Sequence, residues 1–162
     1  MALVAAVIAL ALIEFIVFGL LVARARVQCQ VAAPATTGHP VFERYFRVQQ
    51  NTLEQLIVFV PSVWLFGYYV SALWAAGLGV LFVIGRALYL TGYVADPKKR
   101  SAGFGLSFLP NVILAVGALV GGYGLGALVL TLAALPLAWP RAGTALALAL
   151  LAGAVLWGQA RQ

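Results

Sequence analysis

The sequence predicts an all-α integral membrane protein, a four-helix bundle with an additional C-terminal hydrophobic helix. Of the 162 residues, 64% are hydrophobic and 9% are charged, whereas a soluble domain carries about 25% charged residues. The apolar residues form long runs between short segments rich in proline, glycine and charge, and runs of about 20 apolar residues are typical of spanning helices. The length allows one bundle, so we expect a single transmembrane domain over residues 1–162.

Charge and residue counts narrow the possible partners. A net charge of +6 would suggest nucleic acid for a soluble protein, but basic loops also set the orientation of membrane proteins. We therefore expect membrane lipid and no nucleic acid around this chain. One Cys, one His and four acidic residues exclude an internal disulfide and argue against a buried metal site.

The first span is expected at residues 3–22, followed by Arg24 and Arg26. We interpret it as a retained helix, because it lacks the basic start of a signal peptide and is about as long as a span. Glu14 falls near the middle of the bilayer, where a charged group is costly. We expect Glu14 to be protonated, or to face the bundle interior and pair with a polar partner, with a role in packing rather than in chemistry.

The second helix should begin near Phe42, after a turn-rich loop whose single histidine, His39, has no expected role. Its membrane-spanning part covers residues 48–70, with Pro61 as an expected kink. A third span is expected at 72–94, and the Asp-Pro-Lys-Lys-Arg sequence after it forms a basic turn. Both helices carry their polar residues at one end.

The rest of the chain is apolar again. A fourth span is expected at 106–135, although the Gly-Gly-Tyr-Gly sequence at 121–124 interrupts it. A fifth helix is expected at 142–158, a stretch that carries no charge. That stretch is at the short edge for a span, so the sequence leaves open whether it crosses fully.

Orientation follows from seven of the ten basic residues, which all fall on one side of the membrane if three spans precede the basic turn. The positive-inside rule makes that side cytoplasmic and places the N-terminus outside. The bias toward Ala, Leu, Gly and Arg suggests a bacterial source, and hence an inner membrane. The residues that share this side are Arg24, Arg26, Arg44, Arg47, Lys98, Lys99 and Arg100.

Two columns of polar side chains should meet at this cytoplasmic end. Their residues recur at helical spacing, so each column lies on one helix face. Guanidinium groups suit carboxylates, and carboxylate or amide oxygens suit an ammonium. A ligand with two carboxylates, one amine and several amides, such as glutathione, fits these groups. The columns consist of Arg47, Asn51 and Glu54 on the second helix and of Arg86, Tyr89 and Tyr93 on the third.

Two stretches carry a family resemblance. FERYFRVQQNTLEQL at 42–56 and GRALYLTGYVADPKKRSAGF at 85–104 resemble the MAPEG family. These are membrane-associated proteins of eicosanoid and glutathione metabolism, and they include microsomal glutathione transferases and leukotriene C synthase. The motifs ER-x-x-R-x-Q-x-N-x-x-E and R-x-x-Y-x-x-x-Y both occur, in order and on the expected helices. The resemblance implies a homotrimer of four-helix subunits, with glutathione bound between neighbouring subunits near the cytoplasmic face.

The resemblance also assigns roles by position. Arg100 matches the arginine that stabilises the thiolate of glutathione. Two positions depart from the family pattern, because Gln55 stands where an aromatic residue is common and Val27 where the synthase has a second arginine, which protonates the acceptor. The positions that contact glutathione are matched by Arg26, Arg47, Gln49, Asn51, Glu54, Arg86, Tyr89 and Tyr93.

The expected function is that of a membrane-bound glutathione S-transferase, with glutathione as co-substrate. The free thiol has a pKa of about 8.5, and a guanidinium beside the sulfur favours the thiolate. The thiolate would attack lipophilic electrophiles or, in a peroxidase activity, lipid hydroperoxides that enter from the bilayer. The alternative is a non-enzymatic lipid- or partner-binding member of the family. A transporter or channel is disfavoured, because the polar residues gather at one end of the spans.

Overall fold

The computed structural model describes residues 1–134 and shows only helices and connecting turns in this part of the chain. The predicted all-α fold is thereby confirmed. The predicted fifth helix at 142–158 lies outside the described residues. The elements are α1 (Ala2–Gln28), α2 (Pro40–Tyr69), α3 (Ala72–Ala95), the 3-10 turn η1 (Pro97–Lys99) and α4 (Arg100–Ala134).

The chain divides into two compact units, the first covering residues 1–118 and the second beginning at Leu119. Within the second unit the backbone leaves the helical region at Gly124, with φ 65° and ψ 148°. This break confirms the interruption predicted at 121–124, and glycine adopts a positive φ without steric cost. The single domain predicted over residues 1–162 reaches past the described residues and stays a prediction.

The start of α2 is set by a local capping group. α2 begins at Pro40, two residues before the predicted Phe42, because His39 acts as its N-cap: Nδ1 of His39 accepts a hydrogen bond from the Val41 N–H at 3.2 Å. Proline suits the first helical position, which has no partner for an N–H. His39 therefore has a structural role that the sequence did not indicate.

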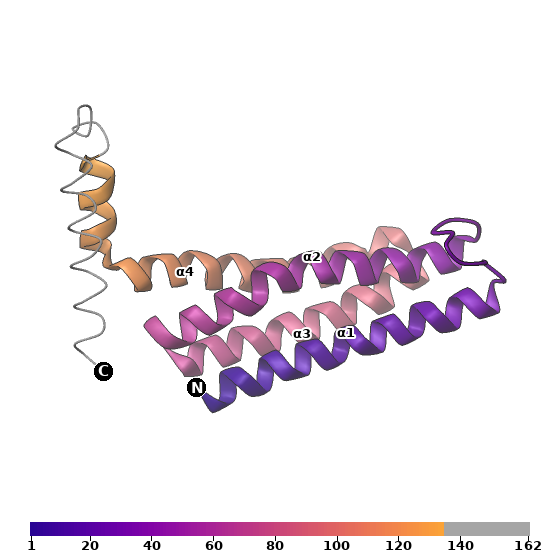
Figure 1. The fold of residues 1–162 in the computed structure, drawn as a ribbon, viewed down its shortest axis with the longest axis horizontal. Helices are drawn as coiled ribbons and strands as arrows, with labels where there is room; N and C mark the ends of the chain where they lie inside the picture. The colour runs from indigo at the N-terminus through magenta and orange to yellow at the C-terminus, as the bar shows by residue number, and fades with distance from the viewer. Residues whose placement is uncertain (135–162) are drawn as a thin grey trace. The chain divides into compact units, whose positions relative to one another are not determined.

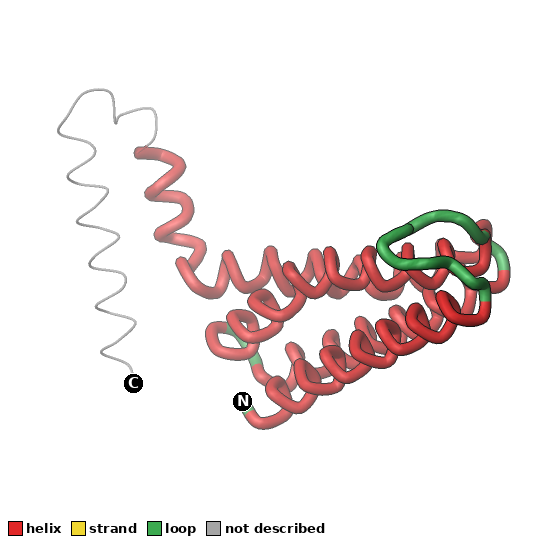
Figure 2. The backbone as a smooth tube through the Cα atoms, turned by 45° about the vertical axis from the view of Figure 1, so that its right-hand side comes forward, coloured by secondary structure: helices red, strands yellow, loops and turns green. Residues whose placement is uncertain are grey.

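In the first unit, α1, α2, α3 and the first part of α4 run side by side (Figure 1). α1 and α3 point in one direction, and α2 and this first part of α4 point in the other. The loop at 29–39 lies at one end of these helices, and the tight connection at 70–71 lies at the other (Figure 2). The apolar core holds a stacked pair of rings, Phe59 and Phe82, with centroids 4.0 Å apart.

Glycines bring α3 and α4 into close contact. A Cβ at Gly85 would lie 2.6 Å from the backbone nitrogen of Ser107, and a Cβ at Gly103 would lie 2.6 Å from Cα of Tyr89. The opposing atoms belong to the backbone, so a larger residue could fit only if the helices moved apart. Small residues allow the same close approach in other membrane bundles. This contact fixes the start of α4 beside Tyr89.

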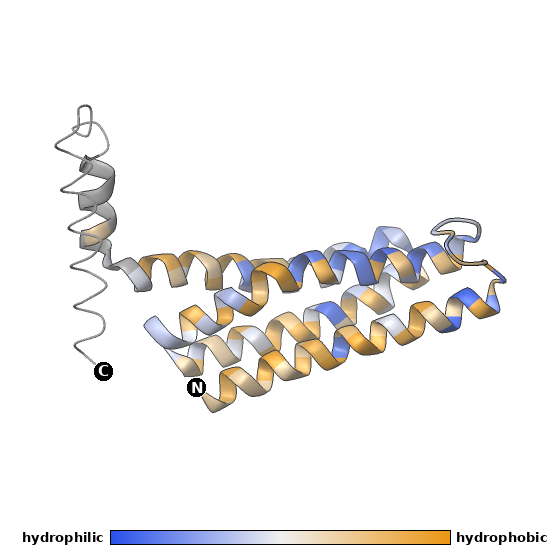
Figure 3. Cartoon of the chain, viewed as in Figure 1, coloured by the Kyte–Doolittle hydropathy of each residue, from blue (hydrophilic) through white to orange (hydrophobic). Residues whose placement is uncertain are grey.

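Three of the described helices are long and apolar enough to cross a membrane: Ala2–Gln28, Ala72–Ala95 and Pro97–Gly122. α2 is not among them, because the polar run in its first half lowers its hydropathy, and the span predicted at 48–70 stays a prediction. Apolar side chains such as Leu20 and Leu73 are 65% and 72% exposed, as lipid-facing side chains are. Hydrophilic residues concentrate toward the end that carries the 29–39 loop (Figure 3). The protein is thus a helical membrane bundle with one polar end.

Candidate functional site

A cavity of about 570 Å³ opens between α2, α3 and the first turns of α4. Its volume lies within the range of about 300–1,000 Å³ that is usual for small-molecule sites. Each of the three helices contributes polar or aromatic side chains to its wall. The lining residues are Arg47 and Asn51 from α2, Tyr89 and Tyr93 from α3, and Arg100, Ser101 and Phe104 from α4.

Helical spacing explains why α2 and α3 each supply a pair. Arg47 and Asn51 are four residues apart, and so are Tyr89 and Tyr93, so the members of each pair project from one face. The two tyrosine rings stack with centroids 5.5 Å apart. The guanidinium carbon of Arg100 lies 5.8 Å from the centroid of the Tyr93 ring, within reach of a cation–π contact.

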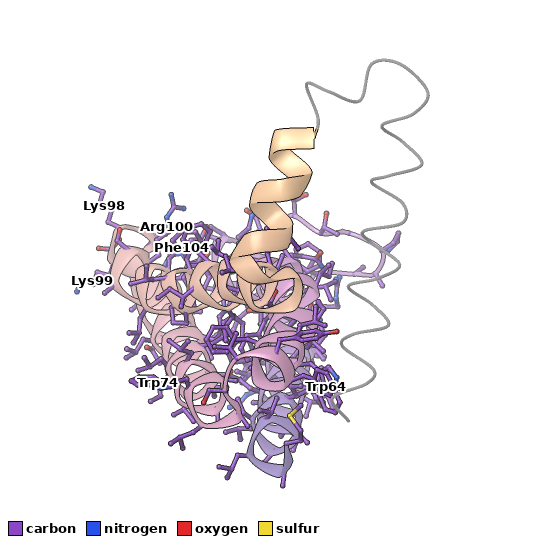
Figure 4. The ribbon with its side chains drawn as sticks, turned by 90° about the vertical axis from the view of Figure 1, so that its left-hand side faces the viewer. Trp64, Trp74, Lys98, Lys99, Arg100 and Phe104 are labelled. Atoms are coloured by element: carbon purple, nitrogen blue, oxygen red, sulfur yellow. The ribbon has the colours of Figure 1, made fainter. Side chains whose placement is uncertain are left out.

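The start of α4 supplies a cation with an aromatic ring beside it. Arg100 opens the helix, and Phe104 follows one turn later with its ring 6.4 Å from that of Tyr89. Figure 4 shows Arg100 at the outer edge of the bundle, in the same region as Lys98 and Lys99. Of these three cations, Arg100 alone is part of the cavity lining. The cavity therefore has an exposed cation at its edge and aromatic carbon next to it.

Arg86 supports the cavity wall from behind. Its side chain is 0% exposed and is not part of the cavity lining. Its Nη1 donates to Oδ1 of Asn51 at 3.1 Å, and its Nη2 and Nε donate to Oγ1 of Thr52 at 2.7 and 3.2 Å. The guanidinium also covers the Tyr89 ring, 4.3 Å from its centroid. Asn51 in turn donates to Oε2 of Glu54 at 3.3 Å, so this network holds Asn51 at the cavity wall.

Two residues of the predicted set, Arg26 and Gln49, lie away from the cavity. Nη1 of Arg26 donates to the Ala35 carbonyl at 2.8 Å, and the guanidinium carbon lies 4.5 Å from the Phe42 ring centroid. Arg26 therefore fastens the 29–39 loop to the end of α1. Nε2 of Gln49 lies 3.5 Å from the Cβ position of Gly19, so Gln49 faces α1. Of the other seven predicted residues, five line the cavity, and Arg86 and Glu54 are each hydrogen-bonded to one of these five, Asn51.

Three residues at the site were not predicted. Ser101 and Phe104 line the cavity, and a signal for both existed, because they follow Arg100 in the first turns of a helix. Thr52 accepts two hydrogen bonds from Arg86, and no pattern in the sequence indicates that contact. It depends on how α2 and α3 pack.

A second polar cavity of about 420 Å³ shares Arg47 and Tyr93 with the first. Arg44 lies on its wall and donates from Nη1 to the Val94 carbonyl at 3.0 Å, near the end of α3, where helix carbonyls lack partners. The rest of the second cavity is lined by Thr36, Thr37, Pro40, Glu43, Phe46 and Gln50.

Among the described residues, no three His, Cys, Asp or Glu side chains are grouped as a metal site would require.

Comparison with known proteins identifies relatives of this chain. It is 47% identical to an uncharacterized protein of Synechocystis sp. over 116 residues, which cover 72% of this chain and 85% of that protein. It is 43% identical to microsomal glutathione S-transferase 2 of Homo sapiens over 108 residues, with coverage of 67% and 71%. It is 38% identical to leukotriene C4 synthase of Cavia porcellus over 85 residues, with coverage of 52% and 57%. The model of the MAPEG family matches residues 2–120, which confirms the resemblance seen in the two motifs. The chain belongs to the MAPEG family.

Proposed function

We propose that this protein is a membrane-bound glutathione S-transferase. The observation that carries the proposal is the convergence of Arg47, Asn51, Tyr89, Tyr93 and Arg100 on one cavity. Two relatives bear the names microsomal glutathione S-transferase 2 and leukotriene C4 synthase, which supports the same function. The expectation of glutathione as co-substrate rests on both lines of argument.

Glutathione would be held by groups of complementary charge. Arg47 can bind one carboxylate through the paired N–H donors of its guanidinium. Glu54 and the oxygen of Asn51 suit the amine, and the hydroxyl groups of the two tyrosines suit the amides. Arg86 would act through Asn51, because its own side chain is buried behind the wall.

We further propose that a neighbouring subunit completes the site in a homotrimer. Arg26 and Gln49 match glutathione-contacting positions of the family. Within one chain, however, Arg26 lies at the end of α1 and Gln49 faces α1, and both are away from the cavity. A site shared between two subunits would bring these residues of one copy to the cavity of the next. Native mass spectrometry of the solubilised protein tests this assembly, and a monomeric species at working concentration would contradict it.

The chemistry we propose is activation of the thiol by charge. The proton of the thiol leaves to water at the open edge of the cavity, and the guanidinium of Arg100 stabilises the remaining thiolate. The sulfur then forms a bond to an electrophilic carbon of a lipophilic acceptor, and the leaving group departs with the electron pair of the broken bond. With a lipid hydroperoxide, two glutathione molecules would instead give the alcohol, water and glutathione disulfide.

The same proposal places the site on the cytoplasmic side of a bacterial inner membrane, with the N-terminus on the other side. The basic residues predicted to share one side belong to the end of α1, the start of α2, the turn before α4 and the first residue of α4. Hydrophilic residues gather at that end of the bundle (Figure 3). The positive-inside rule assigns such an end to the cytoplasm.

Activity and binding measurements test the function. Purified protein should conjugate glutathione to a reactive aryl halide, and calorimetry should detect glutathione binding. A panel of lipid hydroperoxides would reveal the peroxidase activity. Binding without turnover on any acceptor, or no binding at all, would favour the non-enzymatic lipid- or partner-binding alternative.

Replacing Arg47 by alanine should weaken glutathione binding more than it slows turnover. A charge-assisted hydrogen bond contributes about 1.5–3 kcal/mol, so we expect the KM for glutathione to rise by about 10- to 100-fold. The turnover number at saturating glutathione should change less than about fivefold, because a carboxylate contact is present before and during the reaction. Arg24→Ala is a matched control on α1, since Arg24 is exposed and outside the cavity lining. A fall in turnover with unchanged KM would contradict the assigned role.

A further inference from the structure

Glu14 places a carboxyl group in the middle of α1, a helix that is long and apolar enough to span the membrane. Its Oε2 atom is buried and has no hydrogen-bond partner among the described residues. An ionisable side chain at this depth is costly and normally has a partner inside the bundle. The partner of Glu14 can be found from the way that α1 and α3 pack.

The register of the two helices sets Glu14 level with Arg86. α1 and α3 run in the same direction (Figure 1), and Val7 packs directly on Gly79, where a Cβ would collide with its side chain. Seven residues further along each helix, which is about two turns, stand Glu14 and Arg86. Further along α1 the register agrees to within one residue, because Phe18 belongs to the same buried cluster as Tyr89.

Among the described residues, the hydrogen bonds of Arg86 reach no carboxylate. Its acceptors, Asn51 and Thr52, are neutral and lie on α2. A guanidinium carries five N–H donors, and three of them serve these two residues. The Glu14 carboxyl interacts electrostatically with the guanidinium from the α1 side, and that of Glu54 from the α2 side. Glu54 is exposed, whereas the unpartnered oxygen of Glu14 is buried.

We infer that Glu14 is the buried counter-charge of Arg86, and that through Arg86 it positions Asn51 at the wall of the cavity. Two opposite charges inside a bundle are tolerated together, but removing one leaves the other uncompensated. An uncompensated Arg86 would turn toward other acceptors and release Asn51. Glu14 is in this sense a positioning residue. Its effect on glutathione binding rests on the proposed function.

A double-mutant cycle on the ligand-free protein tests the pairing. We expect Glu14→Gln, which removes the charge and keeps the shape, to lower the melting temperature of the solubilised protein by about 5 °C or more. Arg86→Gln should lower it further. The variant with both changes should be less destabilised than the sum of the two, by at least about 3 °C. Glu14→Gln combined with Arg24→Gln, a control on an exposed arginine of the same helix, should be additive.

Each outcome of the cycle decides the inference. Additive effects of Glu14→Gln and Arg86→Gln, or no effect of Glu14→Gln, would overturn it, because a neutral packing group would not be coupled to Arg86. If Arg86→Gln alone yields no folded protein, the variant with both changes should still fold, since no buried charge is then unpaired. Failure of that variant as well would overturn the inference.

A binding measurement tests the positioning role separately. In Glu14→Gln we expect the Kd of glutathione to rise about tenfold, and Glu14→Asp, which restores the charge, should recover most of this loss. An unchanged Kd in Glu14→Gln would limit Glu14 to stability and overturn the positioning role. Absence of glutathione binding in the unaltered protein would instead count against the proposed function, and the melting cycle would stand unaffected.

Discussion

Replacing Arg100 by alanine is expected to lower the turnover number by about 100- to 1,000-fold and to change the Kd of glutathione by less than about threefold. Arg100 is expected to stabilise the thiolate and not the neutral thiol, because the sulfur becomes negative only when the thiol ionises. Arg100 is exposed at the edge of the cavity, beside Tyr93. The measurements are the turnover number with an aryl halide, the Kd by calorimetry, and the ultraviolet absorbance of the bound thiolate.

The activity of Arg100→Ala should also depend on pH in a defined direction. A guanidinium beside the sulfur lowers the pKa of the bound thiol, and each unit of pKa is worth about 1.4 kcal/mol. Without Arg100 the thiol should return toward its free pKa of about 8.5. Activity of Arg100→Ala should therefore rise between pH 7 and pH 9, where the unaltered protein changes less.

Two variants provide controls for Arg100. Arg100→Lys keeps a positive charge and should retain part of the activity, although lysine lacks the paired donors of arginine. Lys99→Ala should leave turnover unchanged, because Lys99 is exposed and outside the cavity lining. Equal losses of binding and turnover in Arg100→Ala, or a similar loss in Lys99→Ala, would contradict a specific role for Arg100.

The helix faces of the site could be predicted from sequence, but the depth of each side chain could not. The spacing of Arg86, Tyr89 and Tyr93 correctly placed them on one face of α3. The structure separates them along that face, since Arg86 is fully buried against Thr52 while Tyr93 lines the cavity. Which member of a column is covered depends on the neighbouring helix, and spacing within one helix holds no information about that neighbour.

The turns of α4 that precede the predicted span were not indicated by the apolar pattern. The expected span began near residue 106, because apolar runs mark the part of a helix inside the membrane. The observed helix begins at Arg100, so Phe104 lies one turn into it and reaches the cavity. The N-cap of α2 was not predicted either, because a lone histidine in a polar loop, such as His39, is usually just solvated. Pro40 nevertheless suits the first position of a helix, although the histidine before it is not among the preferred N-cap residues.

Replacing Gly103 by alanine is expected to lower the free energy of unfolding by about 3 kcal/mol, or the melting temperature by roughly 6–12 °C. A Cβ at this position would lie 2.6 Å from Cα of Tyr89 and 2.7 Å from the carbonyl carbon of Leu88. These are backbone atoms of α3, so no side chain can move aside and the two helices must separate. Thermal unfolding of the solubilised protein measures the loss.

Gly105 offers a matched control two residues away on the same helix. A Cβ at Gly105 would meet no atom of the described chain within 4 Å. Alanine there should leave stability unchanged or raise it by up to about 1 kcal/mol, because alanine favours the helix over the unfolded chain. Equal losses at both positions would indicate a general sensitivity of α4 and contradict a specific contact at Gly103.

The same substitution should also impair the site, which links the helix contact to the chemistry. Gly103 is less than one turn from Arg100, and it rests on the backbone of Tyr89, a cavity residue of α3. Separating the helices moves the guanidinium relative to both tyrosines, and a displacement of about 1 Å can cost about 100-fold in rate. Folded Gly103→Ala protein, assayed well below its melting temperature, should therefore lose turnover while Gly105→Ala keeps it. Full activity in folded Gly103→Ala would mean that the close contact of α3 and α4 serves stability alone.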